Sequence, residues 1–144
     1  MKRRELGRQI ALQALYILDL RGEDFGEPII EFLRESTEDP EVYLFARQLA
    51  QGAWAWRAEA DRLVEQAAEH WNVGRMAILD RNVLRLAVYE LSQCPDIPPR
   101  VALDQAIELA KRFSSAESGA FVNGILDRVL RLLEERRVAK GDAG

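Results

Sequence analysis

The side chains best suited to chemistry in this sequence are arginines and aromatic residues. Arg81, Arg85 and Tyr89 are spaced at i, i+4 and i+8 within "DRNVLRLAVYEL", which places them on one stripe of a helix. Guanidinium and aromatic groups on one stripe suit contact with the phosphates and bases of a nucleic acid. They equally suit packing against a neighbouring helix, with the arginines paired to acids, so the stripe leaves both roles open.

A second basic group lies at the N-terminus, where "MKRRELGR" contains four basic residues around one acid, namely Lys2, Arg3, Arg4, Glu5 and Arg8. The whole chain has a formal net charge of −4, so it is not expected to bind polyanions in general. A local basic segment nevertheless indicates possible phosphate contact, although many basic termini only increase solubility.

Metal-ligating and nucleophilic residues are scarce. The chain has one histidine, His70, and one cysteine, Cys94, which cannot supply the three or four ligands of a zinc site. We expect His70 on the surface or at a helix end, and Cys94 as a small residue before a proline. No Walker, dinucleotide-binding or G-x-S-x-G pattern is present. The sequence therefore predicts no catalytic site, no metal and no cofactor.

The elements that position these side chains are all expected to be helices. The 144 residues suit one domain, strand-like alternation is missing, and apolar residues recur at spacings of three and four. Three prolines, Pro28, Pro40 and Pro99, stand where a helix would begin. The fold class is therefore all-α, with six to seven helices in small bundles and a frayed tail at 137–144. Helices are expected near 4–20, 28–35, 40–70, 75–92, 99–113 and 118–136.

The cellular environment follows from what the composition excludes. Apolar runs are too short to cross a membrane, and no signal-peptide pattern is present at the N-terminus. A single cysteine suits a reducing compartment. We expect a cytoplasmic protein with no membrane partner.

The helix expected near residues 4–20 divides into two arcs when its residues are placed about 100° apart. The apolar arc, expected in the core, holds Leu6, Ile10, Ala11, Ala14, Leu15, Ile17 and Leu18. The remaining arc holds Glu5, Arg8, Gln9, Leu12, Gln13 and Tyr16. Tyr16 is therefore expected to be exposed, either alone or as part of a contact surface.

The stretch "AESGAFVNGILD" begins the last expected helix and places Phe121 and Gly124 close to its start. Glu117 or Ser118 is expected to cap this helix, and Asp80 is expected to cap the helix at 75–92. One interpretation is that Phe121 completes the core and Gly124 permits close helix packing. The other is that glycine beside an edge aromatic leaves a shelf where a flat group can stack near a helix N-terminus.

The sequence resembles the NusB family of bacterial transcription antitermination factors in three ordered stretches, "QALYIL", "DRNVLRLAVYEL…DIP…VALDQAIELAKRF" and "ESGAFVNGILDRVL". The resemblance runs from the first helix to about residue 133, and residues 21–70 contribute little to it. It implies an all-helical protein of two small bundles, roughly residues 1–70 and 71–136. It also implies binding of boxA-containing single-stranded RNA with NusE, a small-subunit ribosomal protein, in the RNA polymerase antitermination complex.

Site residues follow from this resemblance by position. It implies RNA contact by Arg3, Arg4, Arg8, Glu117 and Phe121. It implies contact with NusE by Tyr16 and Asp80. The basic terminus and the arginine stripe add two further expected RNA contacts, Lys2 and Arg85.

The sequence departs from the family pattern at two positions. Relatives often have a lysine before the phenylalanine, whereas this chain has Ala120, and Glu5 interrupts the basic N-terminus. Both differences remove positive charge from the expected RNA surface. We therefore expect weak RNA binding by the free protein and greater dependence on the partner.

Two alternatives belong to other functional classes. A NusB-like domain also forms the N-terminal part of a ribosomal RNA cytosine methyltransferase, whose cofactor-binding domain is not found in these 144 residues. We therefore expect no enzymatic activity. The second alternative is a homodimeric scaffold, in which self-association covers the RNA-binding surface.

Overall fold

The computed structural model describes residues 2–69 and 71–141, and its regular elements within these ranges are all helical. This confirms the all-α fold class. The expected position of His70 lies outside the described residues. The helices are α1 (Lys2–Arg21), α2 (Glu27–Ser36), α3 (Pro40–Ala55), α4 (Arg57–Ala67), a short 3-10 turn η1 (Val73–Arg75), α5 (Ile78–Gln93), α6 (Pro99–Phe113) and α7 (Ala116–Ala139).

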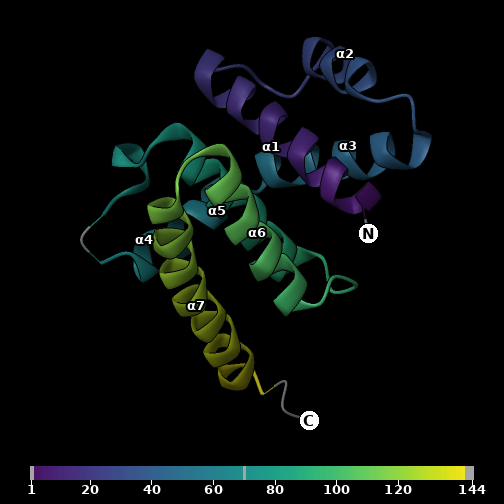
Figure 1. Cartoon of the computed structure of the whole chain (residues 1–144). Helices are drawn as coiled ribbons and strands as arrows, with labels where there is room; N and C mark the ends of the chain where they lie inside the picture. The colour runs from purple at the N-terminus through teal and green to yellow at the C-terminus, as the bar shows by residue number, and fades with distance from the viewer. Residues whose placement is uncertain (1, 70, 142–144) are drawn as a thin grey trace.

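The helices pack as two groups (Figure 1). Helices α1, α2 and α3 form the first group, and α4, α5, α6 and α7 form the second. The groups meet where α1 and α3 pack against α5, which is apolar and buried over much of its length. Because α4 packs on α5 and α7, the division between the groups falls at Trp56 rather than near residue 70.

The expectation of one continuous helix over 40–70 is wrong. Helix α3 ends at Ala55 and α4 begins at Arg57, with Trp56 between them at φ −95° and ψ 7°. The Arg57 guanidinium lies 4.0 Å from the centre of the Trp54 ring and donates to the Trp54 carbonyl oxygen at 2.6 Å. The turn is thus held by side-chain packing, without a proline or glycine at the junction.

Other helix ends agree with the sequence only in part. The three prolines do lie in the first turns of α2, α3 and α6, as expected. Asp80 is not an N-cap, because α5 begins earlier, at Ile78. Neither Glu117 nor Ser118 caps α7; the Ser115 side chain accepts from the Ser118 amide instead. Helix α7 also continues to Ala139, beyond the expected start of a frayed tail at 137.

Helix α1 is buried on a wider arc than its pattern indicates. Leu12, expected on the exposed side, is only 2% exposed, whereas Leu6, expected in the core, is 42% exposed. The cause is that α1 packs against three helices, α2, α3 and α5. A single-helix pattern cannot show that two groups of helices enclose it.

No helix in the described ranges 2–69 and 71–141 is long and apolar enough to cross a membrane.

Candidate functional site

Tyr16 lies in an open apolar groove of about 520 Å³, which we call the Tyr16 groove. Tyr16 and Phe113 are its most exposed aromatic residues, at 37% and 38%. The exposure of Tyr16 agrees with the expectation from the sequence. The neighbouring aromatic residue Phe113 was not expected. The groove is formed by α1, α2, α5 and α6, through Leu12, Gln13, Tyr16, Ile17, Phe32, Leu79 and Phe113.

Phe121 lies in a second hollow of about 250 Å³, which we call the Phe121 pocket. The Trp71 ring stands nearly perpendicular to the Phe121 ring, with the two centroids 6.1 Å apart and the planes at 78°. Phe121 is half-buried, so it is an edge aromatic as expected. The pocket is lined by Trp71, Arg75, Met76, Ala77, Asp80, Ser115, Glu117, Ser118 and Phe121.

A hydrogen bond joins the start of α5 to the start of α7 inside this pocket. The Ser118 hydroxyl lies 3.3 Å from Asp80 Oδ2 and 2.8 Å from the Ser114 hydroxyl. The other carboxylate oxygen, Asp80 Oδ1, is buried and has no hydrogen-bond partner among the described residues. Buried polar atoms are usually satisfied, and this oxygen is an exception.

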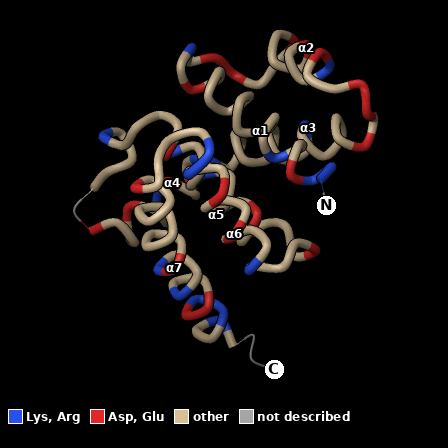
Figure 2. The backbone as a smooth tube through the Cα atoms, in the orientation of Figure 1, with Lys and Arg blue, Asp and Glu red and all other residues tan. Residues whose placement is uncertain are grey.

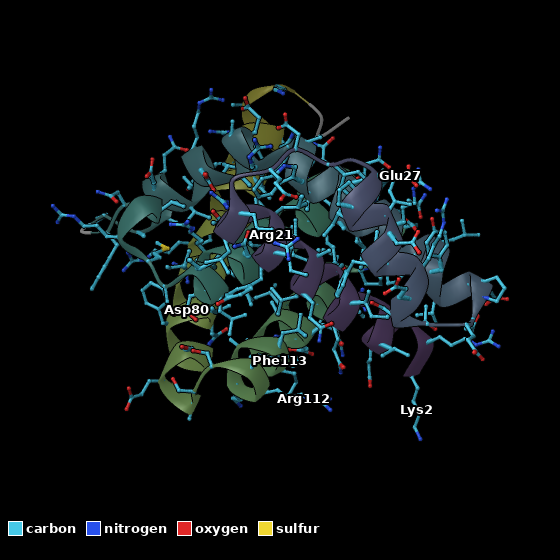
Figure 3. The ribbon with its side chains drawn as sticks, turned by 90° about the horizontal axis from the view of Figure 1, so that it is seen from above. Lys2, Arg21, Glu27, Asp80, Arg112 and Phe113 are labelled. Atoms are coloured by element: carbon cyan, nitrogen blue, oxygen red, sulfur yellow. The ribbon has the colours of Figure 1, made fainter. Side chains whose placement is uncertain are left out.

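The groove and the pocket are neighbours. Leu79 lines the Tyr16 groove, and the next residue, Asp80, lines the Phe121 pocket. Phe113 likewise lines the groove, and Ser115, two residues later, lines the pocket. Seen from above in Figure 3, Asp80 and Phe113 lie on the same side of the molecule. The structure thus brings Asp80, Glu117 and Phe121 into one hollow and places Tyr16 in the adjoining one.

The basic N-terminus lies away from both hollows. In Figure 3, Lys2 is at the opposite end of the view from Asp80, and Figure 2 shows basic and acidic residues together near that terminus. Arg3 pairs with Asp39 at 3.0 Å and also with the exposed Glu41. Lys2, Arg3 and Arg4 are all exposed and remain expected RNA contacts.

The expected exposure of Arg8 is wrong. Its side chain is 2% exposed, and its Nε donates to Glu90 Oε1 at 2.9 Å. Its Nη2 forms an ion pair with the same oxygen of this equally buried residue of α5, at 2.8 Å. Burial raises the pKa of the Glu90 carboxyl more than the hydrogen bond and charge of Arg8 lower it. An ion pair in this position is structural, because a phosphate cannot reach a side chain enclosed by two helix groups.

Arg85 is also buried, which contradicts its expected contact with RNA. It forms a two-pronged pair with Asp61 at 2.8 and 2.9 Å and reaches Asp19 at 3.0 Å. Asp19 also accepts two hydrogen bonds from Arg81, at 2.7 and 2.8 Å. The two arginines of the stripe therefore pack against acids of α1 and α4, which is the second of the two roles left open by the sequence.

These pairs determine the ionisation of Asp19. Burial acts to raise the pKa of its carboxyl, but hydrogen bonds from Arg81 and Asn82 and the nearby arginine charges outweigh burial. The pKa is therefore lowered from its usual value of 3.8. A lowered pKa means that the ionised carboxylate stabilises the fold above that value, and that this contribution is lost as the pH falls through the lowered pKa.

Gly124 is exposed on α7, and a Cβ atom built there would meet nothing within 4 Å. Close helix packing therefore does not explain this glycine, and it does not line the Phe121 pocket. We expect Gly124→Ala to raise the free energy of unfolding by about 0.5–1 kcal/mol, because alanine is the better helix former and has room. Urea unfolding measures this change; a fall in stability would contradict the open environment.

Neither hollow is lined by a cysteine. Cys94 lies elsewhere, and burial raises the pKa of its thiol to about 11, which keeps it protonated near neutral pH. Within residues 2–69 and 71–141, no three His, Cys, Asp or Glu side chains form a group able to hold a metal ion. Trp71, Arg75, Leu79 and Phe113 were not expected from the sequence. An aromatic at the end of an amphipathic helix, such as Phe113, was the signal available.

Comparison with known proteins identifies the family of the chain. The family model described as the NusB family matches residues 6–131. The chain is 46% identical over 139 residues to the transcription antitermination protein NusB of Symbiobacterium thermophilum, covering 91% of this chain and 90% of that protein. It is 44% identical over 133 residues to the protein of the same name from Myxococcus xanthus, with coverages of 90% and 95%.

Solved structures give the same result. A crystal structure of the antitermination factors NusB and NusE in complex with dsRNA contains a chain with a TM-score of 0.82 and 31% identity. The match covers 92% of this chain and 98% of that one. NusB of T. maritima matches with a TM-score of 0.77 and 38% identity, covering 90% of each chain. On sequence and fold together, this chain belongs to the NusB family.

Proposed function

We propose that this protein is a transcription antitermination factor that binds boxA-containing single-stranded RNA together with NusE. The pair joins the RNA polymerase antitermination complex, and the protein acts by binding, without catalysis, in the cytoplasm where bacterial transcription occurs. The observation that carries the proposal is the adjacency of the Tyr16 groove and the Phe121 pocket. A partner in one hollow and RNA in the other would lie side by side.

The composition of the Tyr16 groove supports its use as a protein-binding surface. Its lining is predominantly apolar, and two partly exposed aromatic residues, Tyr16 and Phe113, stand in it. Aromatic residues are over-represented among the residues that contribute most to protein–protein binding. The structure of NusB and NusE bound to RNA, whose NusB chain has the same fold, supports NusE as this partner.

The Phe121 pocket supports recognition of an unpaired base. Sequence-specific RNA recognition mostly uses single strands, because their unstacked bases can turn outward and stack on aromatic side chains. The pocket contains two aromatic rings and polar groups, and it lies at the start of α7. We therefore propose single-stranded RNA as its ligand, with Lys2, Arg3 and Arg4 contacting phosphates beyond it.

RNA binding should depend on the partner. Five basic residues were expected to contact RNA. Arg8 and Arg85 are buried, so the exposed ones are Lys2, Arg3 and Arg4. Each protein alone then supplies few phosphate contacts, and joining two proteins on one RNA multiplies their affinities. We expect boxA RNA to bind at least about tenfold more tightly when NusE is present.

Fluorescence anisotropy with labelled RNA measures this difference, using a scrambled RNA of the same composition as the matched control. Equal affinity with and without NusE, or equal affinity for the scrambled RNA, would contradict the proposal. Size-exclusion chromatography with light scattering tests the homodimeric alternative. A dimer that dissociates when NusE is added would place the self-association surface at the Tyr16 groove.

A further inference from the structure

The Tyr16 groove lies across the boundary between the two helix groups. Five of its lining residues come from α1 and α2 of the first group, and two, Leu79 and Phe113, come from α5 and α6 of the second. The shape of the groove therefore depends on how α1 is held relative to α5. A group that ties these two helices together near Tyr16 also determines the surface that a partner meets.

Such a group lies one turn from Tyr16, at Asp19 on the same helix. The Asp19 carboxylate accepts four hydrogen bonds from α5: two from Arg81 at 2.7 and 2.8 Å, one from Asn82 at 2.8 Å and one from Arg85 at 3.0 Å. Arg81 comes two residues after Leu79, which lines the groove. One carboxylate therefore joins α1 to α5 within a few residues of the groove on both helices.

The positions of these charges within their own helices are unfavourable. The C-terminal end of a helix carries partial negative charge, and the N-terminal end carries partial positive charge. Asp19 lies in the last turn of α1, which ends at Arg21. Arg81 is the fourth residue of α5, which begins at Ile78. The labels Arg21 and Asp80 in Figure 3 mark these two helix ends. Each charge becomes favourable only through the pairing of the two helices.

Asp61 provides a contrast within the same network. It forms its two-pronged pair with Arg85 at 2.8 and 2.9 Å, similar in length to the bonds of Asp19. Asp61 lies on α4, however, so this pair joins two helices of the second group. Loss of Asp61 would weaken that group internally, whereas loss of Asp19 would weaken the connection between the groups.

We propose that Asp19 is a positioning residue for the Tyr16 groove, and that its bonds to Arg81 and Arg85 hold α1 against α5 in the arrangement that the protein partner binds. This inference rests on the proposed function, in which NusE occupies the groove. Asp19 does not line the groove, so it acts through the helices and needs no contact with the partner. Without these bonds, only the fraction of molecules in the correct arrangement would bind.

Replacing Asp19 with asparagine tests this role, because asparagine keeps the shape and removes the charge. The fold should survive, since Arg85 keeps Asp61 and the Arg81 side chain, which is 18% exposed, can turn to solvent. We expect NusE affinity per folded molecule to fall about tenfold, as for a binding-competent population reduced to about one tenth. Isothermal titration calorimetry measures the affinity, and urea unfolding gives the folded fraction.

Asp61→Asn is the matched control. It removes a carboxylate from the same arginine network but leaves the bonds between α1 and α5 in place. We expect it to lower stability and to bind NusE within about twofold of the parent protein, the scatter between independent sites. Equal losses of NusE affinity in the two variants, or no loss in Asp19→Asn, would overturn the inference.

NMR spectra of the protein without NusE report the groove itself. The Leu12 methyl and Phe113 ring resonances belong to groove residues of α1 and α6, neither of them next to Asp19 in sequence. They should shift in Asp19→Asn and stay in place in Asp61→Asn. Unchanged resonances in Asp19→Asn would overturn the positioning role. If the parent protein binds no NusE, the proposed function fails, and these resonances still decide whether Asp19 determines the shape of the groove.

Discussion

Replacing Arg8 with methionine is expected to lower the free energy of unfolding by about 3–5 kcal/mol, the usual cost of leaving a buried charge without its partner. Arg8 and Glu90 are each 2% exposed and are joined by one hydrogen bond and an ion pair, so the Glu90 carboxylate cannot turn to solvent. Urea unfolding at neutral pH measures the change. A loss below about 1 kcal/mol would show that Glu90 finds another partner or water.

The same variant should become sensitive to pH. Burial already raises the pKa of Glu90 above its usual value of 4.5, and removing Arg8 removes the main opposing cause. A group whose pKa is higher in the folded state favours folding below its unfolded pKa, and this contribution is lost as the pH rises through the folded pKa. Arg8→Met should therefore be less destabilised near pH 5 than near pH 8.

A double variant provides the matched control. In Arg8→Met with Glu90→Leu the buried charge is gone, and apolar replacements of buried ion pairs are often neutral or stabilising. We expect the double variant to recover most of the lost stability and its pH dependence to disappear. Its RNA affinity per folded molecule should equal that of the parent, because Arg8 is enclosed. A loss of RNA affinity without a loss of stability would show that Arg8 does contact RNA.

Placing a charge in the Tyr16 groove is expected to weaken NusE binding by at least about 2 kcal/mol, or about 30-fold, for either Tyr16→Asp or Phe113→Asp. Both side chains are more than one-third exposed in an apolar groove, so an aspartate removes an aromatic contact and leaves a charge to be desolvated by the partner. Both residues are also partly buried, so NusE affinity is compared per folded molecule. Isothermal titration calorimetry measures NusE affinity, and circular dichroism checks helicity.

Leu44→Asp is the matched control, because it adds the same charge to an exposed apolar residue on α3, outside the groove. It should bind NusE normally. If both groove variants also bind normally, NusE does not use this surface. If instead they abolish self-association without changing NusE binding, the groove is a contact between two copies of this chain.

The sequence by itself determined most of the local structure. Spacings of three and four predicted the helices, and three prolines marked first turns correctly because a proline's fixed φ and missing N–H suit only that part of a helix. The exposure of Tyr16 and the edge position of Phe121 also followed from helix faces. These features depend on residues within one or two turns, which is the range that a periodic pattern describes.

Only the tertiary structure decided which polar side chains face solvent. Arg8 and Glu90 are 82 residues apart, and Arg85 meets Asp19 across 66 residues, so no local pattern could pair them. The break between α3 and α4 at Trp56 has no proline or glycine to mark it in the sequence. The contact that accompanies the break is the packing of Arg57 on the Trp54 ring.

Local sequence patterns also could not predict the Tyr16 groove and the Phe121 pocket. Trp71 meets Phe121, and Asp80 meets Ser118, only because α5 and α7 begin at the same end of the second helix group. A helix face shows that a side chain leaves the core, but not what it meets there. That depends on the packing of helices distant in sequence, which here enclosed two expected RNA contacts and joined Asp80 to Phe121 in one pocket.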